Sequence, residues 1–262
     1  MYIQVNGQST FIATGGKTFD TSLPTVVLLH GSGLDHRCWA LQARWFAFHG
    51  YSVFAPDLPG HSLSQGEPLT SIEDMGAWLV AALDAAGVEQ VHLMGHSQGF
   101  LMALEAAPLL GSRVESVMAL ATAAAIPVNP ALIDTAKADT SKAADMMLQW
   151  GFGSDYQYGL SSVPGMQPIG IGQRIMTNNP LATDLEACNN YSGGAARASS
   201  LTCPVQVVLA DQDRMTPMRE GLKLAQTLGV KAQIINGSGH MLPMEAPQQS
   251  LQAMQSFIQT LK

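Results

Sequence analysis

Short apolar runs alternate with helical segments through most of this chain, and this rhythm restricts the fold more than any other feature of the sequence. Strands are expected at 25–29, 51–55, 91–94, 114–120, 205–210 and 231–235. Most of these runs are continuously apolar, as in strands buried on both faces of a sheet. Helices are expected at 39–49, 71–86, 99–110, 217–228 and 247–261. This order predicts a mostly parallel sheet with helices on both faces.

The alternation is preceded by a hairpin and interrupted once. Residues 2–15 are typical of two strands joined at Asn6-Gly7, a dipeptide that favours a tight turn. From about Pro127 to Arg197 the patterning is helical, with no clear strand. We therefore predict an α/β fold with an eight-stranded, mostly parallel sheet. Residues 1–126 and 198–262 would form its core, and a helical cap would be inserted at 127–197.

Composition narrows the class of protein. Hydrophobic residues make up 47% of the 262 residues and charged residues only 13%, which is typical of a globular protein. The formal charge is −7 and the sequence contains no basic patch, so a nucleic acid is not an expected partner. No apolar stretch is long enough to insert into a membrane. Because residues 1–16 also lack a signal-peptide pattern, we expect a cytoplasmic protein, either a monomer or a homodimer.

The three cysteines do not indicate a disulfide framework or a metal site. Cys38, Cys188 and Cys203 are far apart and odd in number, which favours buried, unpaired thiols. Grouped Cys/His spacing and H-E-x-x-H are both missing from the sequence, and Gly170–Gln173 lacks the remaining features of a dinucleotide loop. We expect neither a metal nor a cofactor.

Ser97 is the candidate nucleophile. It is the central residue of Gly95-His96-Ser97-Gln98-Gly99, a G-x-S-x-G pattern between an expected strand and an expected helix. A nucleophile elbow needs this setting, and its turn is so tight that only glycine is tolerated two residues on either side. The alternative is that Ser97 only caps the helix that follows it.

A serine hydroxyl needs a general base, and the base needs an orienting acid. His240 is the only one of the seven histidines after Ser97, and it follows an expected strand directly. Asp211 and Asp213 follow the expected strand at 205–210. We favour Asp213 as the acid because it lies further out on the loop. Asp211, at the end of the strand, is expected to close the turn through nearby backbone amides.

Amide donors for an oxyanion are expected beside the serine. The stretch His30-Gly31-Ser32-Gly33 follows the expected strand at 25–29. A second oxyanion donor comes from this place when a nucleophile elbow is present. We therefore predict the backbone N–H groups of Ser32 and Gln98 as the two donors.

These stretches, taken together, resemble the α/β-hydrolase family, in particular its esterases with a helical cap. The matching segments are LLHGSG, PDLPGHSLS, GHSQG, ADQDRMTP and GSGHMLPMEAP, in this order along the chain. The resemblance implies Ser97, Asp213 and His240 as a triad. Two departures are Ala210, where the family usually has glycine, and Ser62, which replaces a common glycine.

The resemblance implies hydrolysis of a carboxylic ester with a small to medium apolar acyl group, through an acyl-enzyme. The same triad would also serve a lactone, a thioester or a carbon–carbon bond beside a ketone. The GGGPG-type loop of carbon–carbon hydrolases is absent after His30, and a serine at position 97 argues against dehalogenases and epoxide hydrolases. The fold alone is also compatible with a ligand-binding module that has little turnover.

The pocket is expected to be formed by the cap and by residues near Ser97. We predict Gly31, His96, Met147, Trp150 and Met241 in its wall. His96 and His30 are interpreted as supports for their loops rather than as bases. His36 and His61 are expected either to border the pocket or to face water.

Overall fold

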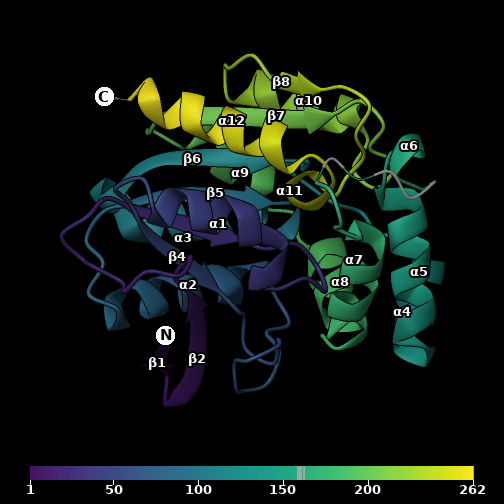
Figure 1. Ribbon diagram of the computed structural model, residues 1–262, viewed down its shortest axis with the longest axis horizontal. Helices are drawn as coiled ribbons and strands as arrows, with labels where there is room; N and C mark the ends of the chain where they lie inside the picture. The colour runs from purple at the N-terminus through teal and green to yellow at the C-terminus, as the bar shows by residue number, and fades with distance from the viewer. Residues whose placement is uncertain (158–160, 162, 262) are drawn as a thin grey trace.

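The computed structural model describes residues 1–157, 161 and 163–261. The strands are β1 (Tyr2–Val5), β2 (Gln8–Ala13), β3 (Thr25–Leu29), β4 (Ser52–Pro56), β5 (Val91–His96), β6 (Val114–Leu120), β7 (Val205–Ala210) and β8 (Gln233–Ile235). They form an eight-stranded sheet in the order β1-β2-β4-β3-β5-β6-β7-β8 (Figure 1). Neighbours from β4 to β8 run parallel, whereas β1–β2 and β2–β4 are antiparallel. The predicted fold class is confirmed.

The expected strands agree closely with the observed ones. The bounds of β3, β6 and β7 coincide with the apolar runs, and every residue of β3 and β5 is buried. The strand β5 continues beyond the expected end to His96, because its pairing with β6 extends through Leu120. At the edge of the sheet, β8 begins only at Gln233.

Helices cover both faces of the sheet. They are the 3₁₀-helices η1 (His36–Trp39) and η2 (Gly111–Arg113), and the α-helices α1 (Ala40–Ala47), α2 (Ile72–Ala85), α3 (Gln98–Leu110), α10 (Met218–Thr227), α11 (Leu242–Glu245) and α12 (Pro247–Gln259). Apolar residues of α1 and α12 pack on one face, and those of α2, α3 and α10 pack on the other. Ser71 caps α2 as expected, because its Oγ accepts the Asp74 N–H at 3.1 Å. None of the described helices is both long and apolar enough to cross a bilayer.

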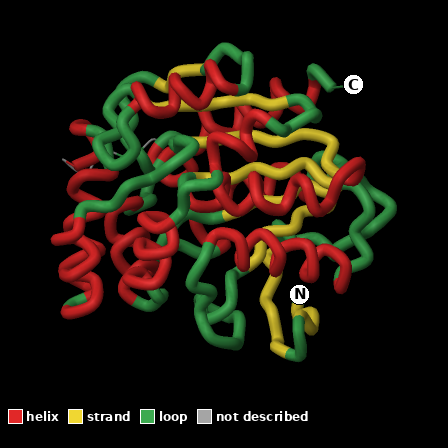
Figure 2. The backbone as a smooth tube through the Cα atoms, turned by 180° about the vertical axis from the view of Figure 1, so that it is seen from behind, coloured by secondary structure: helices red, strands yellow, loops and turns green. Residues whose placement is uncertain are grey.

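A helical segment separates β6 from β7. Its described helices are α4 (Pro130–Ala138), α5 (Thr140–Gly151), α6 (Ser154–Gln157), α7 (Pro168–Thr177), α8 (Leu181–Asn190) and α9 (Gly194–Ser199). We refer to residues 127–197 as the cap. The helices α4, α5, α7 and α8 gather at one end of the sheet, on the right in Figure 1 and on the left in the reverse view of Figure 2. The last helix, α9, packs instead against α3 and α10.

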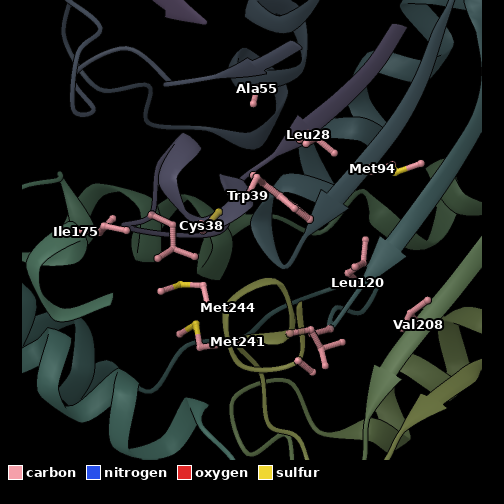
Figure 3. Close-up of a cluster of buried hydrophobic side chains, with 14 of the residues drawn as sticks. Leu28, Cys38, Trp39, Ala55, Met94, Leu120, Ile175, Val208, Met241 and Met244 are labelled. Carbon is pink, nitrogen blue, oxygen red and sulfur yellow. The ribbon is translucent and has the colours of Figure 1, made fainter. Parts of the chain in front are cut away.

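The cap shares its apolar interior with the sheet. Ile175 of α7 belongs to the same cluster of buried side chains as Trp39, Met241 and Met244, which lie outside the cap (Figure 3). The interior is continuous because α11 and the loop before it lie between the cap and the sheet. The cap side chains of this cluster are therefore shielded from water only when the core is folded, and the core side chains only when the cap is folded.

This shared cluster leads to a prediction for stability. Ile175 is 1% exposed, so Ile175→Ala should lower the free energy of unfolding by about 2–4 kcal/mol, through lost burial and a residual cavity. Ile171→Ala on the same helix, at a site that is 38% exposed, should cost less than about 1 kcal/mol. Denaturation followed by far-UV circular dichroism should show one transition for both variants. A separate early transition in Ile175→Ala would contradict a shared interior.

Candidate active site

Ser97 lies in a strained turn between β5 and α3. Its backbone has φ 53° and ψ −120°, a region that residues with a side chain rarely adopt. Two hydrogen bonds hold the turn: the Ser97 N–H donates to Leu120 O at 3.0 Å, and Thr122 Oγ1 donates to Ser97 O at 3.0 Å. Both partners come from the end of the neighbouring strand β6. The sheet therefore enforces a conformation that Ser97 would not adopt alone.

The two glycines of the motif allow chain segments to pass very close to one another. A Cβ atom on Gly95 would lie 2.3 Å from Phe100 N, and one on Gly99 would lie 2.2 Å from Leu29 O. Both distances are far below van der Waals contact with backbone atoms, which cannot move aside. The structure thus shows the steric role expected for glycine two residues on either side of Ser97.

Asp213 and His240 are in direct contact. His240 Nδ1 lies 2.8 Å from Asp213 Oδ2, and both side chains are buried. The other oxygen, Asp213 Oδ1, accepts the N–H groups of Met215 at 2.9 Å and Thr216 at 2.8 Å. An ionised carboxylate only accepts hydrogen bonds, so His240 Nδ1 carries the proton. The lone pair of neutral His240 is then on Nε2.

Asp211 lies elsewhere. It is exposed, and its Oδ1 accepts the N–H of Gly237 at 2.7 Å. This bond joins its loop to the loop that carries His240, whereas Asp213 both closes its own turn and reaches the imidazole. The helix after this loop, α10, begins at Met218, one residue later than expected, and its N-cap is Pro217.

His96 supports the loop of His240 rather than acting on a ligand. Its Nε2 donates to the backbone oxygen of His240 at 2.8 Å, and the two rings lie 5.0 Å apart. Burial, together with the nearby His240, lowers the pKa of His96 to about 3. A permanently neutral imidazole can keep this donor role at all physiological pH values.

The cap also holds the His240 loop. The backbone N–H groups of His240 and Met241 both donate to Gly151 O, at the end of α5. The buried carboxyl group of Glu245 accepts the N–H of Gly153 at 3.0 Å, and it also accepts the N–H of Gly239. Burial raises the pKa of Glu245 to about 8.

Glu245 should make stability depend on pH. The native state keeps its proton up to about pH 8, while the unfolded state loses it near the usual value of 4.5. The stability contribution of the protonated group is therefore lost as pH rises between these values. The stability of Glu245→Gln relative to wild type should therefore increase across that range, by about 4 kcal/mol at pH 8.5 relative to pH 5.

Thermal melting of both proteins from pH 5 to pH 9 would measure this difference. Glu186→Gln, which changes an exposed carboxyl group on α8, should follow wild type throughout. Parallel melting curves for Glu245→Gln and wild type would contradict the raised pKa.

The loop after β3 brings Ser32 and Gly31 beside Ser97. A Cβ atom on Gly31 would lie 3.2 Å from the Ser97 Cβ and 2.8 Å from His96 Nδ1. Only glycine lets the loop approach this closely. Gln98 is the first residue of α3, so its amide lies at a helix N-terminus immediately after Ser97. Gln98 thus directly follows Ser97, and Ser32 lines the same cavity as Ser97.

A cavity of about 380 Å³ contains Ser97 and His240 in its wall. Of the residues predicted near the site, Ser32, His96, Met147, Trp150 and Met241 also line it. Gly31, predicted in the wall, does not line the cavity, and neither does Gln98. Further lining residues were not predicted: Leu34, Ile126, Pro127, Val128, Asn129, Leu132, Leu185, Cys188, Arg214, Met215 and Thr216. Most are apolar residues from the cap and from the loops at the carboxyl edge of the sheet.

His61 differs from expectation. It neither borders the pocket nor faces water, because it is buried against Asp184 of α8 at 3.0 Å. His36 lies outside the pocket wall, where it bonds Asp57 at 2.8 Å and remains partly exposed to water. The sequence around His61 does not indicate that a residue of the cap, Asp184, encloses it.

Ser62, where the family commonly has glycine, has φ 45°, in the left-handed region that favours glycine.

The cysteines are unpaired, as expected, but they are not all buried. Cys38 and Cys188 are buried, whereas Cys203 is partly exposed at the loop before β7. Cys188 lies at the pocket with its Sγ 3.4 Å from Ser32 Oγ. Burial raises the pKa of this thiol to about 12, so it remains protonated and unreactive.

One group of potential metal ligands lies outside the pocket. Candidate ligand atoms of Asp35, His36 and Asp57 lie within 4.8 Å of one another. Their bonds already account for this arrangement: Arg37 forms an ion pair with Asp35, and His36 donates its backbone N–H to Asp57 at 2.9 Å. The geometry therefore needs no metal ion.

The comparison with protein families is decisive. The model of the "Alpha/beta hydrolase family" matches residues 26–253. The chain belongs to the α/β-hydrolase family.

Curated relatives of this α/β-hydrolase cover nearly its whole length at low identity. Carboxylesterase YbfK of Bacillus subtilis (strain 168) is 24% identical over 96% of this chain and 84% of its own. The 3-oxoadipate enol-lactonase 1 of Acinetobacter baylyi is 22% identical over 94% of this chain and 95% of its own.

Solved structures share the fold. The enol-lactonase from Burkholderia xenovorans LB400 superposes with a TM-score of 0.85 at 21% identity, covering 99% of this chain and 100% of its own. A thermophilic esterase from Thermogutta terrifontis gives 0.83 at 20% identity, covering 100% and 98%. At these identities the structural likeness establishes the fold of this α/β-hydrolase but does not identify its substrate.

Proposed function

We propose that this α/β-hydrolase cleaves carboxylic esters through an acyl-enzyme, with Ser97 as nucleophile, His240 as general base and Asp213 as orienting acid. The observation that carries the proposal is the 2.8 Å bond between His240 and Asp213 in a buried site whose cavity also contains Ser97. A serine, an imidazole and a carboxylate arranged in this order are the parts that acyl transfer requires.

The proposed reaction follows from these positions. Ser97 Oγ attacks the ester carbonyl while Nε2 of His240 takes its proton. Asp213 stabilises the imidazolium that forms, and the amides of Ser32 and Gln98 bind the oxyanion. His240 then gives the proton to the leaving alcohol. In the second half, His240 activates a water molecule that releases the acid and restores Ser97.

The size and lining of the cavity support small to medium apolar acyl groups. A volume of about 380 Å³ suits a small ligand, and Leu132, Met147, Trp150 and Leu185 give much of the wall an apolar surface. Methionine side chains adapt to different shapes, which favours acceptance of several acyl groups.

A lactone is the second candidate substrate. It is a cyclic ester and needs the same chemical steps. The observation in its favour is that an enol-lactonase superposes over the whole chain with a TM-score of 0.85. Turnover of purified protein on a panel of p-nitrophenyl esters and lactones of matched acyl length would rank the two classes. No turnover of either class by folded protein would contradict the proposed function.

Covalent labelling tests Ser97 directly. A fluorophosphonate should react at Ser97, because His240 activates its hydroxyl group. Mass spectrometry of the digested protein should find the adduct on the peptide that contains Ser97, and Ser97→Ala should abolish it. An adduct elsewhere in folded protein, with Ser97 unmodified, would overturn the assignment.

The two neighbouring aspartates provide a matched pair of variants. Asp213→Asn keeps the shape but removes the charge that stabilises the imidazolium, so kcat should fall by on the order of 10⁴-fold. Asp211→Asn should cost less than about tenfold, because Asp211 only bonds Gly237. The measurement is kcat on one activated ester, with folding checked by thermal melting. A larger loss for Asp211→Asn would transfer the acid role to Asp211.

A further inference from the structure

Two polar side chains of the cap hold one residue, Gly33, of the loop after β3. We call residues 30–33 of this loop the oxyanion loop, because it carries the predicted donor Ser32. Asp184 of α8 is fully buried, and its Oδ2 accepts the Gly33 N–H at 2.7 Å. Asn179, just before α8, donates from Nδ2 to Gly33 O at 3.0 Å and to Leu34 O at 3.1 Å. Both hydrogen-bonding groups of Gly33 are thus fixed by the cap. Ser32, the preceding residue, supplies one of the two predicted oxyanion amides.

The charge of Asp184 is balanced by His61. His61 Nε2 lies 3.0 Å from Asp184 Oδ2, and His61 Nδ1 lies 3.0 Å from the backbone oxygen of Pro59. Both facing atoms are acceptors, since a carbonyl oxygen and a carboxylate oxygen carry no hydrogen. Only the imidazolium form donates at both nitrogens. The geometry therefore requires a doubly protonated His61.

The surroundings of His61 agree with this charge. Burial, the largest single influence, lowers the pKa of His61, but the charge and hydrogen bond of Asp184, together with Pro59 O and Asp57, outweigh it and the pKa is raised. The other titratable groups that act on His61 are Asp57, which also raises its pKa, and His30, whose ring lies 5.1 Å away. Burial lowers the pKa of His30, and its Nε2 accepts the Leu58 N–H at 3.4 Å, so His30 remains neutral.

We propose that Asp184 is a positioning residue for the oxyanion loop, and that its hold on Gly33 depends on the proton of His61. The buried carboxylate fixes the Gly33 amide only while His61 neutralises it. When His61 loses its proton, one ring nitrogen presents a lone pair to an acceptor, and the bond arrangement around Asp184 and Pro59 is broken. The Ser32 amide then loses its position beside Ser97. This inference rests on the proposed function, because the oxyanion forms only if Ser97 attacks an acyl group.

The first test compares Asp184→Asn with Glu186→Gln, two residues along the same helix. Asp184→Asn keeps the size of the side chain but removes the charge that holds the proton on His61. Glu186 is exposed and pairs with Lys137 on α4, so its variant tests a charge change on α8 away from the loop. The assay is hydrolysis of p-nitrophenyl butyrate at pH 7.5, with active sites counted by fluorophosphonate titration.

We expect kcat per active site to fall about 10- to 100-fold in Asp184→Asn, with KM changed less than about twofold, because a misplaced donor weakens the transition state more than the ground state. Inhibition by butylboronic acid, which forms a tetrahedral adduct with the serine, should weaken by the same factor. Glu186→Gln should match wild type in all three values. A purely structural role would lower the number of titrated sites and leave kcat per site and boronate inhibition unchanged. That result would overturn the proposal.

The second test uses the pH profile. Because Asp184 and Pro59 O both accept from His61 and its pKa is raised, the hold on Gly33 is present below that pKa and lost as pH rises through it. Wild-type kcat should therefore fall on the alkaline side. Asp184→Asn should show at neutral pH the low kcat that wild type reaches only at alkaline pH, with no alkaline limb of its own. A wild-type kcat that stays flat to pH 10 in folded protein would overturn the role of the proton.

His61→Gln keeps the tests decisive if Asp184→Asn does not fold. Its amide can donate to Asp184 but cannot titrate, so the alkaline limb should vanish. An alkaline limb that persists unchanged would overturn the role of His61. The outcomes also separate the two proposals. Absence of labelling at Ser97 defeats the proposed function, whereas labelled, active wild type with an equally active Asp184→Asn defeats only the inference about Asp184.

Discussion

The left-handed backbone of Ser97 depends on three strands approaching one another without side chains in between. Gly99 passes directly beside Leu29 O at the end of β3, and the Ser97 N–H donates to Leu120 O at the end of β6. Such proximity is possible only where parallel strands end together at one edge of a sheet. The order β3-β5-β6 therefore determines both the position of Ser97 at the cavity and the meeting point of the loops that surround it.

The cap holds the loops around Ser97 as well as lining the pocket. Gly151 accepts two backbone hydrogen bonds from the His240 loop, while Asp184 and Asn179 hold Gly33 in the loop before η1. The loops at the two sides of Ser97 are thus positioned by two different parts of one inserted segment, the end of α5 and the region of α8. In the proposed mechanism, one loop carries the base and the other an oxyanion donor, so a shift of the cap displaces both.

Local patterns in the sequence are sufficient for the sheet and for the turn at Ser97. Largely apolar runs predict β3, β6 and β7 to the residue, and a glycine-flanked serine after a strand predicts the turn. Contacts between the cap and the core were not predictable. Asp184 and Gly33 are separated by 151 positions, and nothing in the local pattern of α8 distinguishes Asp184 from an exposed acid. For the same reason His61 was expected at the pocket or in water, because its partner comes from the cap.

The shared interior of cap and core has a consequence during synthesis on the ribosome. The cap precedes β7, β8 and α11 in the chain, yet its buried side chains, such as Ile175, pack in one cluster with Met241 and Met244. Until that last part of the chain emerges, this apolar surface lacks part of its partners and is open to non-specific association. A stall of the ribosome between α9 and β8 would therefore prolong the exposure of this surface.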